Sequence, residues 1–353
     1  MRRLYVANMK DVSYCVGCEI RSPRLPVRRA ASVYVTVSVV YPIALAFSLA
    51  DLGASAGEVP RNAEQAFSFV VTADPRQEGS SWRNALREIR DMTVNAEPAF
   101  APPSWVIVAG DMDPARKRFE DYTTVFSDTA SRPPLVPVVG NHDTGFGDFT
   151  FIRDVMIPSI RGVVRREPDS CDYYFDYRNV RMIVVDVYTK SGKKGVIRKS
   201  GREWVKNTVE TAPVSIDHIF LSFHEPAFPR GRHLKDSFNE DIPQRDAFWR
   251  MLISCGRVRA VFVGHTHGYN RLRILNPESA GANDAAAFPD DEGGIYQVDA
   301  GAAGHGATST FVRVQVEGKN VSFRTCEAIN GPDQPFVECD RWELPMPGDE
   351  SAR

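Results

Sequence analysis

The sequence predicts an α/β fold in which a parallel or mixed β-sheet is backed by a second sheet. After residue 57 the chain alternates between short runs of β-forming apolar residues and segments with helical periodicity. Its last third turns to strand-like segments, and short polar motifs come directly after several apolar runs. Strands that alternate with helices and are followed by further strands are typical of layered α/β domains.

The first part of this domain alternates strand and helix. We expect a strand at Phe67–Thr72, a helix at Trp82–Asp91, a strand at Trp105–Ala109, a helix at Ala115–Phe126 and a strand at Leu135–Val139. An antiparallel pair should then follow, made of Tyr173–Phe175 and Arg181–Val187 and joined by a turn at Arg178–Asn179.

The second part begins with two more helix and strand pairs and then contains strands only. We expect helices at Gly201–Thr211 and Arg245–Cys255 and strands at His218–Phe223, Val258–Val263, Tyr269–Ile274, Gly294–Val298, Thr310–Val316 and Val321–Thr325. Residues 276–292 are expected to form a surface loop, and Leu344–Arg353 lacks periodicity and is expected to be disordered. We therefore assign residues 57–330 to one domain and residues 331–353 to a C-terminal extension.

Composition excludes some classes of partner. Hydrophobic residues make up 43% and charged residues 25% of the chain, as in ordinary soluble proteins. The net charge is −2, and the first 56 residues hold seven basic against three acidic side chains, so the rest of the chain is mildly acidic at −6. A mildly acidic domain is not expected to bind nucleic acid.

Residues 1–56 do not fit the pattern of the domain. They are basic, and the stretch Ala30–Ala50 carries no charge and is mostly apolar. Small residues follow at Ala54-Ser55-Ala56, where a signal peptidase would cleave. We interpret this segment as an export signal, with a retained membrane anchor as the alternative. Either interpretation places the domain outside the cytoplasm, in a periplasm or secreted.

The cysteines offer two pairs to consider. Cys15 and Cys18 have metal-like or redox-like spacing but lie inside the leader, so we interpret the spacing as chance. Cys326 and Cys339 flank a short loop and could form a disulfide in an exported protein, although sequence alone does not determine connectivity.

Polar side chains at the ends of predicted strands suggest a metal site. Asp74, Asp111, Asn141, His224 and His265 each follow an apolar run. Ligands of α/β sheets bind beyond the carboxyl ends of the strands. Carboxylate, amide oxygen and imidazole together suit zinc, manganese or iron. Asp111 could bridge two ions, and such a pair favours phosphate-ester hydrolysis because it activates a bridging water.

The motifs Gly140-Asn141-His142-Asp143 and Gly264-His265-Thr266-His267, with Gly110-Asp111, resemble the calcineurin-like metallophosphoesterase superfamily. The similarity runs from about Phe67 to Gly304 and extends to the exported branch that includes purple-acid-phosphatase-like enzymes. The resemblance implies a β-sandwich of two mixed sheets flanked by helices. It also implies that a metal-activated hydroxide hydrolyses a small phosphorylated substrate, either a monoester or a diester.

The resemblance also implies a role for each matching residue. One or two transition-metal ions (Mn, Zn or Fe) would bind, the first to Asp74 and His267, the second to Asn141, His224 and His265, with Asp111 between them. His142 would contact the scissile phosphate and assist the leaving oxygen. Asp143 would orient His142.

The first motif departs from the family pattern. The family usually has Asp-x-His, but this chain has Asp74-Pro75-Arg76. A guanidinium has no lone pair to give to a metal, so the first site loses a ligand. Arg76 could bind a phosphate oxygen of the substrate or pair with an acidic neighbour. This departure supports an alternative function, a catalytically weakened protein that binds metal or phosphate and keeps the fold.

The second motif departs as well. Asp113 could replace the missing ligand, but an Asp followed by Pro at a helix start is typical of an N-cap, which we favour. The tyrosine that binds iron in purple acid phosphatases would fall at Pro114, so an iron–tyrosinate centre is not expected.

The remaining histidines have weaker patterns. His218 begins a predicted strand and is expected to be structural. His233 lies in a basic loop, residues 230–235, for which we favour solvent exposure over contact with an anionic substrate. His305 follows a predicted strand, and substrate contact is the less favoured interpretation of its position.

Overall fold

The computed structural model describes residues 66–77, 79–94, 101–127, 132–188, 196–278 and 294–344. The chain divides into two compact units, residues 1–57 and 58–353, and all described residues belong to the second. The predicted leader, most of the predicted loop at 276–292 and the tail after Leu344 lie outside the described residues. In the described part of the chain, no helix is long and apolar enough to span a membrane.

The domain contains two β-sheets. The first, sheet A, has six strands in the order β13 (Val337–Glu343), β12 (Asn320–Ile329), β11 (Thr308–Glu317), β1 (Phe67–Thr72), β2 (Pro103–Val108) and β3 (Leu135–Pro137). The second, sheet B, has seven strands in the order β4 (Val164–Arg165), β5 (Tyr173–Tyr177), β6 (Val180–Val184), β7 (His218–Ser222), β8 (Val258–Val263), β10 (Ile295–Ala300) and β9 (Tyr269–Ile274). Both sheets are mixed, because β1–β2–β3 and β6–β7–β8–β10 run parallel while the other pairs are antiparallel.

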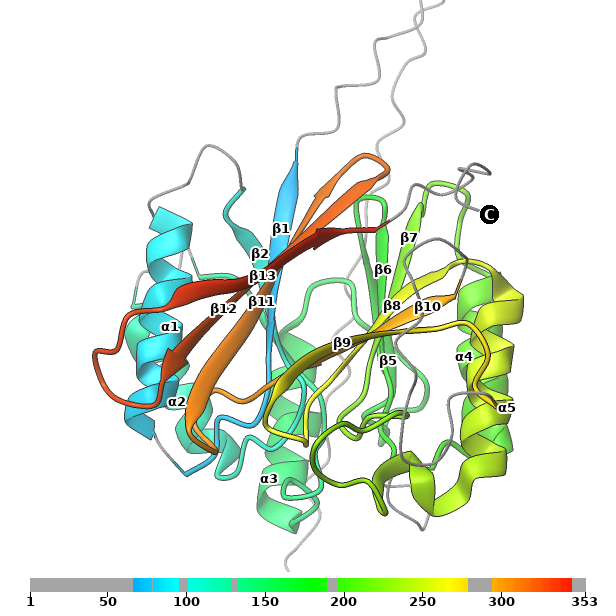
Figure 1. Cartoon of the computed structure of the whole chain (residues 1–353), viewed down its shortest axis with the longest axis horizontal. Helices are drawn as coiled ribbons and strands as arrows, with labels where there is room; N and C mark the ends of the chain where they lie inside the picture. Colours follow the sequence, from blue (N-terminus) through cyan, green and yellow to red (C-terminus); the bar gives the residue numbers. More distant parts are fainter. Residues whose placement is uncertain are drawn as a thin grey trace, which may run out of the picture. The chain divides into compact units, whose positions relative to one another are not determined.

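Helices flank the two sheets, as the fold prediction requires (Figure 1). The pair α1 (Gly79–Val94) and α2 (Ala115–Val125) packs beside sheet A, with contacts from α1 to β2 and β11. The pair α4 (Lys199–Glu210) and α5 (Ile242–Cys255) packs beside sheet B, with contacts from α5 to β8. Short helical segments are α3 (Phe146–Phe151), η1 (Ile152–Met156), η2 (Ile157–Ser159) and η3 (Ser237–Asp241). The predicted sandwich of two mixed sheets flanked by helices is therefore confirmed.

Aromatic side chains fill the space between the sheets. The ring of Phe69 on β1 lies 5.6 Å from Phe220 on β7 and 5.8 Å from Phe262 on β8. Trp105 on β2 packs edge-on against Phe175 on β5 at 5.5 Å. Each such aromatic pair adds about 0.5–1.5 kcal/mol to the effect of burial. These contacts hold the carboxyl ends of β1, β2, β7 and β8 in fixed relative positions.

The outer face of sheet B is covered by its helices. Val205 and Val209 of α4 and Phe248 and Trp249 of α5 are buried in one apolar cluster with β7 and β8. Because these strands are buried on both faces, they form continuous apolar runs in the sequence instead of alternating ones.

Most predicted elements are present, and β1, β8 and β9 have the predicted bounds. The sequence did not predict β4, α3 or β13. Strand β13 lies within the segment assigned to a C-terminal extension, yet it pairs with β12 as the edge of sheet A.

The disulfide considered between Cys326 and Cys339 is not formed; both are free thiols. A register shift next to Cys326 pairs it with Glu338, while the Cys339 thiol lies 3.6 Å from the carbonyl of Thr325. One cysteine is buried and the other exposed, so the two thiols do not face each other.

Candidate metal centre

The predicted ligands meet where the carboxyl ends of the two sheets face each other. Asp74 and Asp111 follow β1 and β2 of sheet A, while His224 and His265 follow β7 and β8 of sheet B. A backbone hydrogen bond joins the two loops that follow β1 and β2, since the amide of Asp74 donates to the carbonyl oxygen of Gly110 at 3.0 Å. His224 joins the two sheets, because its Nδ1 lies 2.7 Å from the carbonyl oxygen of Ala109.

The bond to Ala109 fixes the tautomer of His224. A carbonyl oxygen only accepts, so Nδ1 must carry the hydrogen and Nε2 of the neutral ring presents its lone pair. That nitrogen faces Oδ1 of Asn141 at 3.1 Å and Oδ1 of Asp111 at 3.4 Å. With the ring in this neutral tautomer, three acceptor atoms converge here, and a cation placed among them would bind all three.

Asp74 completes this group. One ligand atom from each of Asp74, Asp111 and His224 can be chosen so that all lie within 4.8 Å of one another, and all three residues are buried. Oδ2 of Asp74 accepts from the amide of His265 at 2.9 Å, while its buried Oδ1 has no hydrogen-bond partner. An unpaired carboxylate oxygen in the interior is costly. The donor set therefore fits a bound transition-metal ion.

The backbone at these positions is strained. Asp74, Asp111, His265 and His267 have positive φ angles of 48°, 57°, 72° and 61°. Non-glycine residues seldom adopt this region, which costs of order 1–3 kcal/mol and is found mainly at functional sites. The strain turns each side chain sharply out of its strand end and toward the others.

Two glycines allow the loops to approach this closely. A Cβ on Gly110 would lie 2.2 Å from Nδ1 of His224, and φ of Gly110 is +98°. A Cβ on Gly140 would lie 2.2 Å from Oδ1 of Asp111. Any side chain at either position would displace a ligand, which explains why both motifs begin with glycine.

Asp143 stabilises the loops and not the ring of His142. Its carboxylate accepts from the backbone amides of Asp111 (2.9 Å), Met112 (2.8 Å) and Gly140 (2.8 Å). Among the described residues no hydrogen bond joins this carboxylate to the side chain of His142, so its hydrogen bonds serve the loops instead of the predicted orienting contact. It fixes the loop that carries Asp111 relative to the loop that carries Asn141.

His142 lies at the open side of the centre. Its backbone amide donates to Oδ1 of Asp111 at 2.9 Å, and its Nε2 lies 3.9 Å from Oδ2 of the same carboxylate. The side chain is 42% exposed, in contrast to the buried ligands. It is thus free to contact a substrate that approaches from solvent.

The electrostatics of the site fit a cation. Burial, and then the neighbouring Asp111 carboxylate, raise the pKa of Asp74 to about 8, against the opposing effect of His224. Burial lowers the pKa of His265 below its usual range, and burial together with Arg232 lowers that of His267 to about 3. The imidazoles are therefore neutral, as metal ligands must be, and a cation would relieve the repulsion between the carboxylates.

Arg76 pairs with two acidic neighbours within the site. Its Nη1 lies 3.7 Å from Oδ2 of Asp111, and its Nε lies 3.2 Å from Oδ1 of Asp113. The predicted N-cap role of Asp113 is wrong. The cap residue of α2 is Pro114 and makes no side-chain cap bond, while Asp148 accepts from the amide of Ala115 at 2.7 Å.

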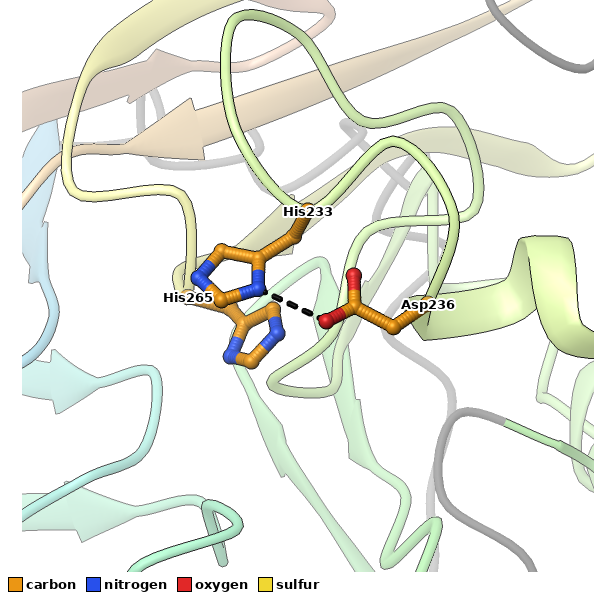
Figure 2. Close-up of side chains that lie close together, drawn as sticks. All are labelled: His233, Asp236 and His265. Atoms are coloured by element: carbon orange, nitrogen blue, oxygen red, sulfur yellow. Dashed lines mark hydrogen bonds and ion pairs between the residues drawn. The ribbon is translucent and has the colours of Figure 1, made fainter.

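Sequence reasoning missed the loop that follows β7. The ring of His233 lies 3.9 Å from the ring of His265, and its Nδ1 bonds to Asp236 at 2.9 Å (Figure 2). These three residues form a second group of possible metal ligands. His233 also has a positive φ of 56°, as the ligands do. Gly231, Arg232 and Lys235 of this loop are exposed, as predicted, but His233 is half-buried against His265, and no sequence motif pointed to that contact.

His267 and His305 lie together at one side of the centre. Nε2 of His267 is 3.5 Å from Oδ1 of Asp74, and the ring of His305 packs edge-on against His267 at 4.1 Å. Nη1 of Arg232 lies 2.7 Å from Nδ1 of His267. Arg232 is therefore a residue of the site that had no motif to reveal it.

The two mixed sheets and the buried carboxylate–imidazole cluster at their carboxyl ends define an α/β sandwich with a candidate metal-binding centre. Residues 67–269 match the family model described as calcineurin-like phosphoesterase. This match covers more than half of the chain, and the chain belongs to that family.

Among curated proteins nothing matches the chain. Among solved structures, Vps29 from Chaetomium thermophilum is similar with a TM-score of 0.35 and 11% identity, over 80% of this chain and 100% of that one. The Vps29 of the same organism complexed with a RaPID-derived cyclic peptide, RT-D3, gives a TM-score of 0.32 and 8% identity, over 80% and 98%.

Proposed function

We propose that this protein hydrolyses phosphate esters with one or two bound transition-metal ions, as a phosphomonoesterase or phosphodiesterase acting on a small phosphorylated substrate. The observation that carries the proposal is the buried group of Asp74, Asp111 and His224, whose ligand atoms lie within 4.8 Å of one another. Membership of the calcineurin-like phosphoesterase family supports the same reaction class. Manganese, zinc and iron all suit this donor set.

The chain's own residues divide the remaining tasks. A metal ion bound here would supply a water ligand of lowered pKa and positive charge for the phosphoryl oxygens. Asn141 and His265 are the further ligands proposed for it. His142, exposed beside Asp111, is placed to donate a hydrogen bond to the phosphate and to assist the leaving oxygen. Asp143 holds the two motif loops at the distance that this arrangement needs.

The test is turnover of aryl phosphates by the purified protein. With manganese, zinc or iron added, we expect release of nitrophenol from a nitrophenyl monoester or a bis-nitrophenyl diester. His142→Ala should lower kcat about 100-fold or more, because general acid catalysis contributes on the order of 10²–10⁴-fold. The absence of turnover with all three metals, with His142→Ala behaving as the wild type does, would refute enzymatic function.

One observation favours a second candidate, a metal- or phosphate-binding protein with weakened catalysis. Arg76 takes the place of a metal ligand and pairs with Asp111 and Asp113. This candidate predicts metal and phosphate binding without turnover. The aryl phosphate assay, run beside a phosphate-binding measurement on the same preparation, separates the two functions.

We also propose that the protein belongs to the exported, purple-acid-phosphatase-like branch and works outside the cytoplasm. The support is the basic, then apolar, then small-residue order of residues 1–56. N-terminal sequencing of the protein from soluble and membrane fractions tests this. A start near residue 57 in the soluble fraction means a cleaved signal, and an intact N-terminus in the membrane fraction means an anchor. An intact N-terminus in the cytoplasm contradicts export.

A further inference from the structure

We propose that Arg76 and Arg232 take the place of the family's first metal ion, so that the centre holds a single ion and binds the substrate phosphate with two guanidinium groups. The substrate part of this inference rests on the proposed function. The metal count and the binding of phosphate do not depend on turnover.

The chemistry of His267 is the first argument. Arginine donates hydrogen bonds and never accepts them, so Nδ1 of His267 must offer its lone pair to Arg232 at 2.7 Å. In the neutral ring Nε2 then carries the hydrogen, and this nitrogen lies 3.5 Å from Oδ1 of Asp74. Neither nitrogen of His267 is left with a free lone pair. The residue expected to bind the first ion is thus engaged by a guanidinium instead.

Arg76 is the second argument. It stands at the position of the first imidazole ligand, and its guanidinium lies 3.7 Å from Asp111 and 3.2 Å from Asp113. With Asp74 these make three carboxylates around the position of the first ion. One divalent ion together with Arg76 balances their charge, whereas two divalent ions and Arg76 would leave an excess of two positive charges. The charge of Arg232 then remains to attract an anion.

The two guanidinium groups lie beside the same pair of carboxylates. Arg76 lies 3.7 Å from Asp111, and Arg232 contacts His267, whose Nε2 lies 3.5 Å from Asp74. Ligand atoms of Asp74 and Asp111 lie within 4.8 Å of each other. A phosphate bound at this pair is therefore within reach of both arginines. A planar fork of donors suits the oxygens of a phosphate group.

The loop that carries Arg232 is anchored. The next residue, His233, packs on the ring of His265 and is held by Asp236, as Figure 2 shows. The start of the loop is joined to β10 by a reciprocal pair, in which Phe228 donates to and accepts from the side-chain amide of Gln297 at 2.9 and 2.8 Å. Contacts at both ends hold the exposed Arg232 side chain beside the centre.

Metal content gives the first test. The full chain, with Cys15→Ser and Cys18→Ser to remove another possible metal site, is loaded with manganese or zinc, dialysed and analysed for metal per chain. We expect one ion in this protein and two when Arg76→His and Arg232→Met are added together, because the first restores the family's Asp-x-His motif and the second frees Nδ1 of His267. Two ions without these substitutions, or one ion with both, overturn the replacement of the first ion.

Phosphate binding gives the second test, by calorimetry with inorganic phosphate on the metal-loaded protein. Arg232→Met should weaken binding about tenfold or more, since a hydrogen bond to a charged group is worth about 1.5–3 kcal/mol. Arg76→Met should act in the same direction. Arg90→Met is the matched control, because the Arg90 side chain on α1 is 40% exposed and, among the described residues, pairs with the neighbouring Asp91 and not with the centre. Because Arg232 is exposed, its variant should fold. Unchanged phosphate affinity in Arg232→Met overturns the binding of phosphate by the two guanidinium groups, whether or not aryl phosphates are hydrolysed.

Discussion

At the scale of single residues, the centre depends on close approach between loops. Gly110 has a φ of +98°, and a Cβ there would lie 2.2 Å from Nδ1 of His224. Gly110→Ala should therefore lower the free energy of unfolding by at least about 2 kcal/mol, from backbone strain and overpacking. It should also weaken metal binding, because the ring of His224 must move. Urea unfolding and metal titration measure the two effects.

Gly147→Ala is the matched control for this substitution. Gly147 lies in α3, and an added Cβ would meet nothing within 4 Å. Alanine is the better helix former, so stability should not fall. If Gly110→Ala lowers the free energy of unfolding and the metal affinity no more than Gly147→Ala does, the close packing of the two motif loops is not what positions His224.

The carboxylate of Asp143 gives a second prediction at this scale. Asp143→Asn keeps the shape but turns one acceptor oxygen into a donor, which must face a backbone amide of Asp111, Met112 or Gly140. An unsatisfied buried donor costs about 1–3 kcal/mol, so unfolding in urea should occur at lower concentration. A variant with unchanged stability and reduced kcat would instead support the orienting role that the sequence suggested.

The ligands could be predicted because each is a polar residue directly after an apolar run, as at Asp74 and His224. The contacts of Arg232 and His233 could not, because they depend on how a loop folds back over the strand ends. The sequence also suggested that Asp113 caps α2. The structure differs because Arg76, from another loop, competes for its carboxylate.

At the scale of elements, strands with continuous apolar sequence were predictable and the edge of sheet A was not. Strand β13 is mostly exposed, with only Trp342 buried among charged neighbours. That indole stacks on Phe323 of β12 at 3.8 Å and lies under the guanidinium of Arg271 at 4.6 Å. Trp342 also packs on Tyr296 of β10 at 4.7 Å, and Asp340 pairs with Arg271 of β9 at 3.4 Å. These long-range contacts hold the strand, and no local periodicity predicts it.

The start of β7 is joined to the turn between β11 and β12 by His218. Its buried ring bonds through Nε2 to the carbonyl of Gly318 at 2.8 Å, in agreement with the structural role predicted for it. Burial makes the largest contribution and lowers the pKa of His218. The hydrogen bond to Gly318 opposes this shift, and Arg259 adds a smaller lowering. The folded protein therefore prefers the neutral ring.

The sign of the pH effect follows from this lowered pKa. The stabilisation should be complete above the unfolded pKa of about 6.5 and should decrease as the pH falls below it, because the unfolded chain then binds the proton more tightly. His218→Gln keeps a donor for Gly318 but does not titrate. Between pH 8 and pH 5.5 it should lose less stability than the wild type, as measured by urea midpoints. Equal losses would show that His218 does not contribute to acid sensitivity; the other histidines are common to both proteins.

At the scale of the whole molecule, the candidate centre joins the two sheets. Asp74 and Asp111 come from sheet A, and His224 and His265 come from sheet B. Within the described domain, the bond from His224 to Ala109 and the buried aromatic contacts link sheet A to sheet B. A metal ion would add bonds to ligands from both sheets at this point. Its binding should therefore stabilise the folded domain as a unit.

This coupling predicts that metal raises the melting temperature. At a free metal concentration about 100 times the Kd, binding contributes about 2.7 kcal/mol. For a domain of this size that corresponds to a rise of roughly 5 °C in Tm. A chelator should reverse the rise, and His224→Gln should abolish most of it, since this variant removes the nitrogen that faces Asp111 and Asn141. Calorimetric melting with and without metal measures both effects. An equal rise in the wild type and His224→Gln would mean that the ion binds elsewhere, because a ligand stabilises a fold only through the site it occupies in the folded state.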